Sequence, residues 1–180
     1  DIPGTEVLVR GFDSQGEKFD IVHESMAFQF IGNDRATHLD NVMPLLAPDG
    51  IAIFEEKFIQ DEDVQAENEA KKDAWKMNFY SEEQLSTKDR EILRRKIKEG
   101  EEAAVGMQSD QVRADFMEAE LKKRFKNVVQ YWDSGNFRGY VASNDLGKVK
   151  EFVRNLGVRK HEFETRSVPR VVEDLVLPEG

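Results

Sequence analysis

Residues 46–58, which read LAPDGIAIFEEKF, decide how the fold of this chain is interpreted. The Pro-Asp-Gly triplet at 48–50 is typical of a turn, here expected to follow a helix. The four apolar residues at 51–54 predict a short buried strand. That strand runs directly into Glu-Glu-Lys at 55–57, so the question is what three charged side chains contact at the end of a buried strand.

Composition limits the classes of protein to consider. The chain has 180 residues, 39% of them hydrophobic and 34% charged, which is typical of one hydrated globular domain. No apolar run approaches the ~20 residues that a membrane helix needs, so we expect no membrane partner and a cytoplasmic protein. The net charge of -10 argues against binding nucleic acid through the whole surface. With no cysteine and no closely paired histidines, the sequence predicts no metal site.

Strands alternate with helices in the first part of the chain, which predicts an α/β fold with a mostly parallel sheet. A later pair of strands joined by a Gly-containing connection predicts an antiparallel hairpin at one edge. Residues 59–108 are highly charged and predict a helical insertion. The expected strands are 6–11, 18–25, 51–54, 127–132 and 137–143, and the expected helices are 33–46, 61–77, 81–99, a segment after 109, and 145–157. Asn33 or Asp34 suits the N-cap of the first helix, and Pro44 should weaken its last turn. The helix at 81–99 starts with a capping box at 81–84.

The order of these elements resembles the later half of a class I S-adenosylmethionine-dependent methyltransferase. The resemblance lies in FDIVHESMAFQFI at 19–31, LAPDG followed by IAIFEEKF at 46–58, and VVQYWDSGNFRGYVAS at 128–143. The segments AFQFI, EKF and NFYSEEQLSTK are closest to the carboxy-S-adenosylmethionine synthase-like branch. The resemblance implies a Rossmann-like sheet, with 1–180 forming one partial domain and 59–108 a cap within it.

The glycine-rich cofactor loop of that family is absent, because no two glycines stand in a G-x-G relation. By resemblance the chain begins just before the family's third strand. Either a preceding segment has been lost or left out, or the remaining strands pair differently; we expect the former. As it stands, the chain is expected to bind S-adenosylmethionine poorly.

The resemblance implies two groups of cofactor-binding residues. Phe12 would stack on the adenine, and Asp13 would accept a hydrogen bond from its amino group, although a simple loop explains both equally well. The second group follows the strand at 18–25 and would line the methionine and adenine sides of the cofactor. It consists of Glu24, Ser25, Met26, Ala27 and Phe28.

His23 and Glu24 are sequence neighbours, which suggests a hydrolase triad at first sight. Adjacent residues on a strand point to opposite faces, so these two side chains cannot converge. We therefore expect no triad at this position. No catalytic base is predicted elsewhere either.

Residues that would contact the methyl acceptor are predicted only from their position in the sequence. Glu55 and Lys57 follow the strand at 51–54, where they either face a binding crevice or form a solvated strand end. In the first case the ends of this strand and of the strand at 18–25 adjoin, and Ser25 and Glu55 lie on the two sides of one crevice. Tyr80 belongs to the inserted helices that would cap the site. The carboxylated cofactor needs a basic residue where the alignment places Asp89, so that branch depends on Arg90 next to it.

Three functions remain open from the sequence. The first is methyl transfer from S-adenosylmethionine to a small-molecule or RNA acceptor, with the basic run at 88–98 as a contact for RNA or, more simply, as a solvated helix face. The second is a carboxy-S-adenosylmethionine synthase-like enzyme that uses the carboxylated cofactor. The third is a degenerate methyltransferase fold that serves as an interaction module. The oligomeric state is left open, a homodimer included.

Overall fold

The computed structural model describes residues 16–27, 31–79, 86–107, 111–156 and 170–172, and the side chains among them except those of 75–79, 100–107 and 170–171. Phe12, Asp13, Phe28 and Tyr80 lie outside the described residues, as does the strand predicted at 6–11. The elements in chain order are β1 (Phe19–Ser25), α2 (Arg35–Val42), the 3-10 helix η2 (Met43–Leu45), β2 (Leu46–Lys57), α3 (Glu62–Phe79), α4 (Thr87–Met107), α5 (Ala114–Arg124), β3 (Asn127–Ser134), β4 (Phe137–Ser143), α6 (Leu146–Leu156) and β5 (Arg170–Val171).

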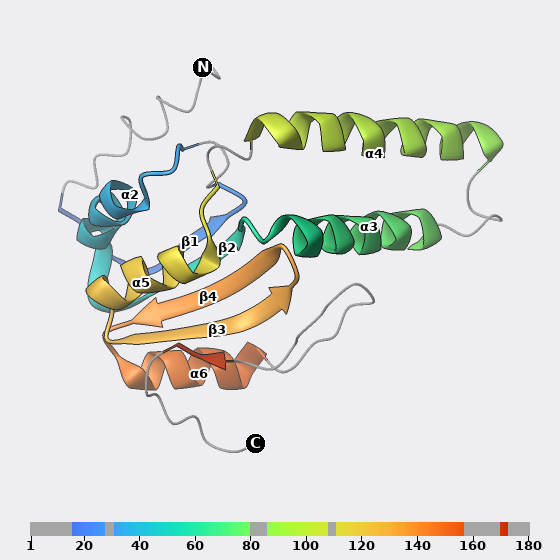
Figure 1. Ribbon diagram of the computed structural model, residues 1–180. Coiled ribbons are helices and arrows are strands. Elements are labelled where there is room, and N and C mark those ends of the chain that lie inside the picture. The colour runs from blue at the N-terminus through green and yellow to red at the C-terminus, as the bar shows by residue number, and fades with distance from the viewer. Residues whose placement is uncertain (1–15, 28–30, 80–85, 108–110, 157–169, 173–180) are drawn as a thin grey trace.

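The strands form one mixed sheet in the order β1-β2-β4-β3-β5, so the predicted α/β class is confirmed (Figure 1). The predicted hairpin is present as β3 and β4, and β5 adds a short strand outside β3. The expectation of a mostly parallel sheet is wrong for the described strands, because only β1 and β2 run parallel. The reason is the two-residue connection between β3 and β4, which is too short for a parallel crossover.

The Pro-Asp-Gly triplet at 48–50 lies inside β2, which corrects the predicted turn. The pairing with β1 jumps here from Phe19↔Leu46 to Ile21↔Ile51, so the extra residues of β2 bulge out of register. Gly50 fits this bulge because a Cβ atom there would lie 2.9 Å from the backbone oxygen of Phe19. β2 also continues beyond its predicted end at 54, because β4 pairs with it as far as Lys57.

Local signals around α2 behave as predicted. Asp34 caps the helix by accepting a hydrogen bond from the Thr37 backbone N–H at 3.0 Å. Pro44 lies in the 3-10 helix that replaces the last α-helical turn, as expected for a residue without an amide donor. The chain then enters β2 directly.

Helices cover both faces of the sheet. On one face, α2 and α5 pack on β2, β3 and β4 around the buried side chains of Leu39, Phe54, Phe58, Met117, Leu121 and Tyr140. On the other face, α6 packs on the same strands around Val129, Tyr131, Val141 and Val149. The sheet therefore separates two apolar layers, and its strand ends remain available between them.

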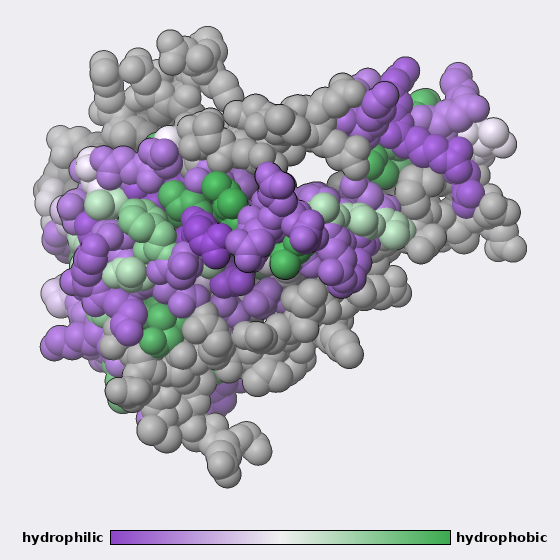
Figure 2. Space-filling view, viewed as in Figure 1, coloured by the Kyte–Doolittle hydropathy of each residue, from purple (hydrophilic) through white to green (hydrophobic). Residues whose placement is uncertain are grey.

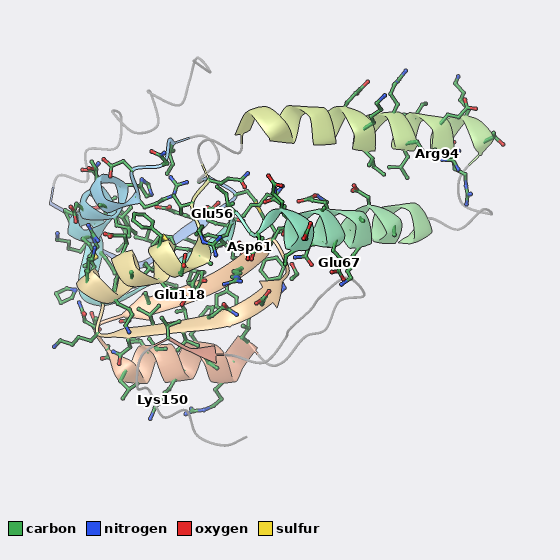
Figure 3. All side chains as sticks on the ribbon, viewed as in Figure 1. Glu56, Asp61, Glu67, Arg94, Glu118 and Lys150 are labelled. Carbon is green, nitrogen blue, oxygen red and sulfur yellow. The ribbon has the colours of Figure 1, made fainter. Side chains whose placement is uncertain are left out.

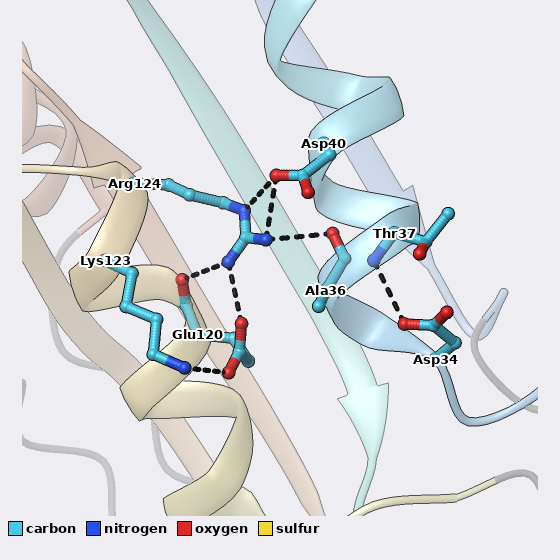
Figure 4. A network of polar contacts seen from close by, with 7 residues as sticks. All are labelled: Asp34, Ala36, Thr37, Asp40, Glu120, Lys123 and Arg124. Atoms are coloured by element: carbon cyan, nitrogen blue, oxygen red, sulfur yellow. Dashed lines mark hydrogen bonds and ion pairs between the residues drawn. The ribbon is translucent and has the colours of Figure 1, made fainter.

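Arg124 joins α5 to α2 (Figure 4). Its guanidinium donates to Asp40 at 2.8 Å, to the backbone oxygen of Ala36 at 2.9 Å and to the Glu120 carboxylate at 2.8 Å. Lys123 also donates to Glu120. These hydrogen bonds raise the pKa of Arg124 and lower the pKa of Glu120, so both groups stay charged at neutral pH. The two helices on this face are thus fixed to each other by polar contacts as well as by the core.

Helices α3 and α4 occupy the interval predicted to be helical and project from the sheet as an arm (Figure 1). The base of the arm is closed: Ile59 and Arg113 form a parallel bridge, and Arg113 donates to Asp61 at 2.9 Å. The capping box expected at 81–84 lies outside the described residues, and α4 begins at Thr87 with Ser86 accepting from the Asp89 backbone N–H. Figure 2 shows that the coloured surface of α4 is mainly hydrophilic.

The closed base predicts that the arm can be removed without unfolding the rest. None of the described side chains of α3 or α4 belongs to either core cluster. We expect a variant in which about six Gly and Ser residues replace 61–110 to unfold cooperatively, with its melting temperature lowered by no more than about 5 °C. Circular dichroism melting measures this. Loss of a cooperative transition would show that the arm is part of the core.

Candidate functional site

The carboxyl ends of the two parallel strands meet, as the sequence predicts. Ser25 pairs with Glu55 in the sheet register, and the Met26 backbone N–H donates to the Glu55 backbone oxygen at 2.9 Å. The segment after β1 and the charged end of β2 are therefore in direct contact. In sheets with parallel strands, ligands bind beyond such carboxyl ends, so this is the candidate site.

The loop that leaves β1 begins in an unusual conformation. Met26 has φ 54 and is the one residue other than glycine with positive φ among the described residues. The next residue, Ala27, donates its backbone N–H at 2.9 Å to Glu56 Oε1. Left-handed residues other than glycine are costly and are found preferentially at functional sites. The surrounding contacts hold Met26 in this conformation.

Glu56 is the residue of this site that sequence reasoning missed. Its side chain is only 1% exposed, so its carboxylate is held inside the protein and not in solvent. It lies on the same face of β2 as Phe54, because side chains two residues apart on a strand share a face. That alternation was the available signal, but a charged residue after an apolar run is ordinarily interpreted as solvated.

Glu24 points to the face of the sheet that α2 covers. Both of its carboxylate oxygens lie within hydrogen-bonding distance of His38 Nε2, at 3.0 and 2.8 Å. His23 points to the opposite face, where its Nε2 lies 3.2 Å from Glu55 Oε2. The predicted separation of His23 and Glu24 is confirmed, and each pairs with a residue distant in sequence.

A row of polar side chains crosses the sheet on the α6 face. His23 of β1 contacts Glu55 of β2, and the Tyr131 hydroxyl of β3 donates to Glu55 Oε1 at 2.7 Å. Burial, together with the Glu55 carboxylate, raises the pKa of Tyr131 well above its usual range, so the hydroxyl remains a donor. Tyr131 reaches Glu55 across Gly139 of β4, and its ring packs edge-on against Phe152 at 5.1 Å.

Gly139 is required for this crossing, which gives a prediction. A Cβ atom at this position would lie 2.7 Å from Tyr131 Cζ. We expect Gly139→Ala to displace the ring, break its hydrogen bond to Glu55 and lower the free energy of unfolding by about 2 kcal/mol. Urea denaturation measures the loss. In a Tyr131→Ala background the same substitution should cost little, and an equal cost in both backgrounds would disprove the steric cause.

Lys57 is engaged within the chain. The sequence predicted that Lys57 contacts the methyl acceptor. In the structure its Nζ lies 2.8 Å from Glu69 Oε1 of α3, and its side chain is only 10% exposed. Lys72 also pairs with Glu69, and Asn136 donates to Glu69 Oε1 at 2.8 Å. Burial would raise the pKa of Glu69, but the hydrogen bonds from Lys57, Lys72 and Asn136 outweigh it and lower the pKa to about 2.

This lowered pKa predicts how α3 docking depends on pH. A carboxyl group whose folded pKa is depressed stabilises the fold above its ordinary pKa of 4.5, and that contribution is lost as pH falls toward about 2. We expect the side-chain amide NMR signals of Asn136 to be constant from neutral pH down to pH 4.5 and to move with a midpoint near pH 2. A midpoint near 4.5 would mean that Glu69 is not held by the two lysines.

Arg90 is not brought to the strand ends. α4 starts at the free end of the arm and runs back toward the sheet, so its first turn, which contains Arg90, is far from β1 and β2 (Figure 1). Arg94, one turn further along, is likewise well separated from Glu56 (Figure 3). Asp89 accepts a hydrogen bond from Ser86 Oγ at 2.6 Å. The structure thus brings Ser25, Met26 and Ala27 against the end of β2 at Glu55 and Glu56. The Glu24 side chain turns instead to α2, and Arg90 lies elsewhere.

No group of three or more acidic, histidine or cysteine side chains suited to a metal ion occurs among the residues described. Within those same ranges, no helix combines the length and the apolar character needed to cross a membrane. Comparison with protein-family models and with curated proteins finds no match to this chain.

Proposed function

We propose that this chain is the later half of an S-adenosylmethionine-dependent methyltransferase whose acceptor is a small molecule or RNA. The observation that carries the proposal is the loop after β1. Met26 is left-handed, and the amides of Met26 and Ala27 are held by Glu55 and Glu56 at the meeting point of two parallel strands. Such preorganisation of a loop at a strand end is expected of a binding site.

The order and direction of the strands support the same proposal. The resemblance implies a parallel pair of strands followed by an antiparallel hairpin, with helices inserted between them. The sheet has this arrangement in β1, β2, β3 and β4, with α3 and α4 inserted after β2. A fold alone does not establish an activity, so the proposal depends on the loop and not on the strand order.

The charges at the strand ends suit a cationic ligand. S-adenosylmethionine supplies a sulfonium group whose methyl carbon is attacked by the acceptor, and the electrons of the broken carbon–sulfur bond stay on sulfur. The Glu55 carboxylate is 33% exposed and lies on the α6 face at the end of β2, where it contacts His23 and accepts from Tyr131. Glu55 would favour a positive charge there, and the fixed loop would orient the two reactants. We assign no general base.

The carboxy-S-adenosylmethionine alternative is less well supported. The extra carboxylate of that cofactor needs a nearby cation. Arg90, the residue expected to supply it, lies in the first turn of α4 at the free end of the arm. Ordinary methyl transfer needs no such group. The interaction-module alternative is favoured by one observation, the absence of any G-x-G pattern in the 180 residues.

Calorimetric titration with S-adenosylmethionine tests the proposal. The natural full-length protein is used, with whatever residues its gene encodes ahead of Asp1. We expect saturable binding to one site. A folded protein that gives no heat of binding would exclude methyl transfer and leave the interaction module.

A further inference from the structure

A single carboxylate joins three elements where the arm meets the sheet. Glu69 of α3 pairs with Lys57 at the end of β2 and with Lys72 of its own helix, and it accepts a hydrogen bond from Asn136 in the β3–β4 turn. Its side chain is 22% exposed, and those of Lys57 and Lys72 are 10% and 20% exposed. All four polar groups are therefore largely removed from solvent.

The same lysines flank an aromatic ring. The Nζ atoms of Lys57 and Lys72 each lie 5.9 Å from the centre of the Phe137 ring, the first residue of β4. Asn68 adds a hydrogen bond to Asn136 at 3.2 Å. The two lysine ammonium groups thus both contact the Glu69 carboxylate and both lie beside the Phe137 ring. We call Lys57, Glu69, Lys72, Asn136 and Phe137 the hub.

The hub accounts for how the arm is held. The first half of α3 contacts the β3–β4 turn through the hub, through Asn68 and through the Gln65 backbone oxygen, which accepts from Asn136. Further along the described arm, ion pairs such as Lys71 with Glu67 and Arg95 with Glu99 join residues of the same helix. The direction of the whole arm is therefore set at its base.

We propose that Glu69 is the positioning residue that fixes the α3–α4 arm relative to the carboxyl ends of β1 and β2. Lys57 directly follows Glu56, the residue that holds the Ala27 amide. The hub therefore ties the arm to the same strand end that orders the candidate binding loop. This inference concerns the geometry of the arm and holds whether or not the protein transfers methyl groups.

Removing the carboxylate should do more than delete a contact. Without Glu69, two half-buried ammonium groups would face each other with no neutralising charge between them. Like charges in a partly desolvated site repel, and an ion left unpaired there is costly. The arm can relieve this repulsion by swinging away at the base of α3, because the sheet core contains none of its described side chains.

Distance measurements between two spin labels test the proposal. The chain has no cysteine, so labels can be attached at Lys96→Cys on α4 and Arg154→Cys on α6, both exposed in the structure. Double electron–electron resonance should give one narrow distance distribution in the otherwise natural protein. With Glu69→Ala the distribution should become at least about twice as broad, while the melting temperature of the sheet changes little.

Two further variants separate positioning from general disturbance of α3. Glu67→Ala removes a carboxylate that is 66% exposed and pairs only along the helix with Lys71, so it should leave the distribution narrow. Glu69→Lys should broaden it, and adding Lys57→Glu should narrow it again, since one carboxylate and two ammonium groups are restored. An unchanged distribution in Glu69→Ala, or a broad one before any hub substitution, would overturn the proposal.

Discussion

In the natural full-length protein, Glu56→Ala is expected to abolish measurable binding of S-adenosylmethionine and to lower the free energy of unfolding by about 3 kcal/mol. The carboxylate of Glu56 is 1% exposed and accepts the Ala27 backbone N–H at 2.9 Å. Alanine would leave that amide without its acceptor, so the loop after β1 would lose the contact that holds it to β2. Titration calorimetry and urea denaturation of the same variant measure the two effects.

A matched control for Glu56→Ala is Glu151→Ala. Glu151 is exposed on α6, on the other side of the sheet, so its removal should change neither quantity by more than about 0.5 kcal/mol. Glu56→Gln keeps an acceptor oxygen for Ala27 and should retain part of the binding. If Glu56→Ala bound S-adenosylmethionine as tightly as the natural protein, the loop would not be the binding element.

Phe54→Ala should be the most destabilising of the predicted core substitutions. Phe54 is 0% exposed and belongs to the cluster that α2 and α5 form on the sheet. Truncating a fully buried phenylalanine costs about 4 kcal/mol, because transfer free energy is lost and a cavity remains. In a protein of this size that corresponds to a fall in melting temperature of roughly 12 °C, which calorimetry can measure.

Ile21→Ala provides the comparison on the neighbouring strand. Ile21 is also aliphatic and lies in β1, but its side chain is 59% exposed. Its truncation should cost less than about 1 kcal/mol. Equal effects of the two substitutions would mean that Phe54 of β2 is not buried in the core as the structure describes.

Local signals in the sequence predicted much of the fold. Asp34 and Pro44 marked the two ends of α2, and the Gly-containing connection marked the β3–β4 hairpin. Pro48 and Gly50 misled the prediction, because the same residues that favour turns also fit a bulge within a strand. The difference is decided by pairing of β2 with β1 and β4, which no local signal encodes.

The sequence predicted the position of the candidate site from the ends of the strands, but it did not predict the side-chain contacts there. Ser25 and Glu55 were expected to adjoin, and they pair in the sheet. The contact of Tyr131 with Glu55 joins residues 76 apart in sequence, so it depends on the register of three strands, β2, β4 and β3. The contact of Lys57 also could not be predicted from local sequence. Lys57 was expected to contact the methyl acceptor, but α3 is placed so that Glu69 is its partner.

We propose that the segment after β1 and the end of β2 form a binding site for a sulfonium nucleoside. Amide NMR of the natural full-length protein, titrated with S-adenosylmethionine, tests this proposal. We expect the amide signals of Met26 and Ala27 to be among those that shift most, while those of α6 residues such as Glu151 stay in place. Saturable binding that leaves the Met26 and Ala27 signals unmoved would contradict it.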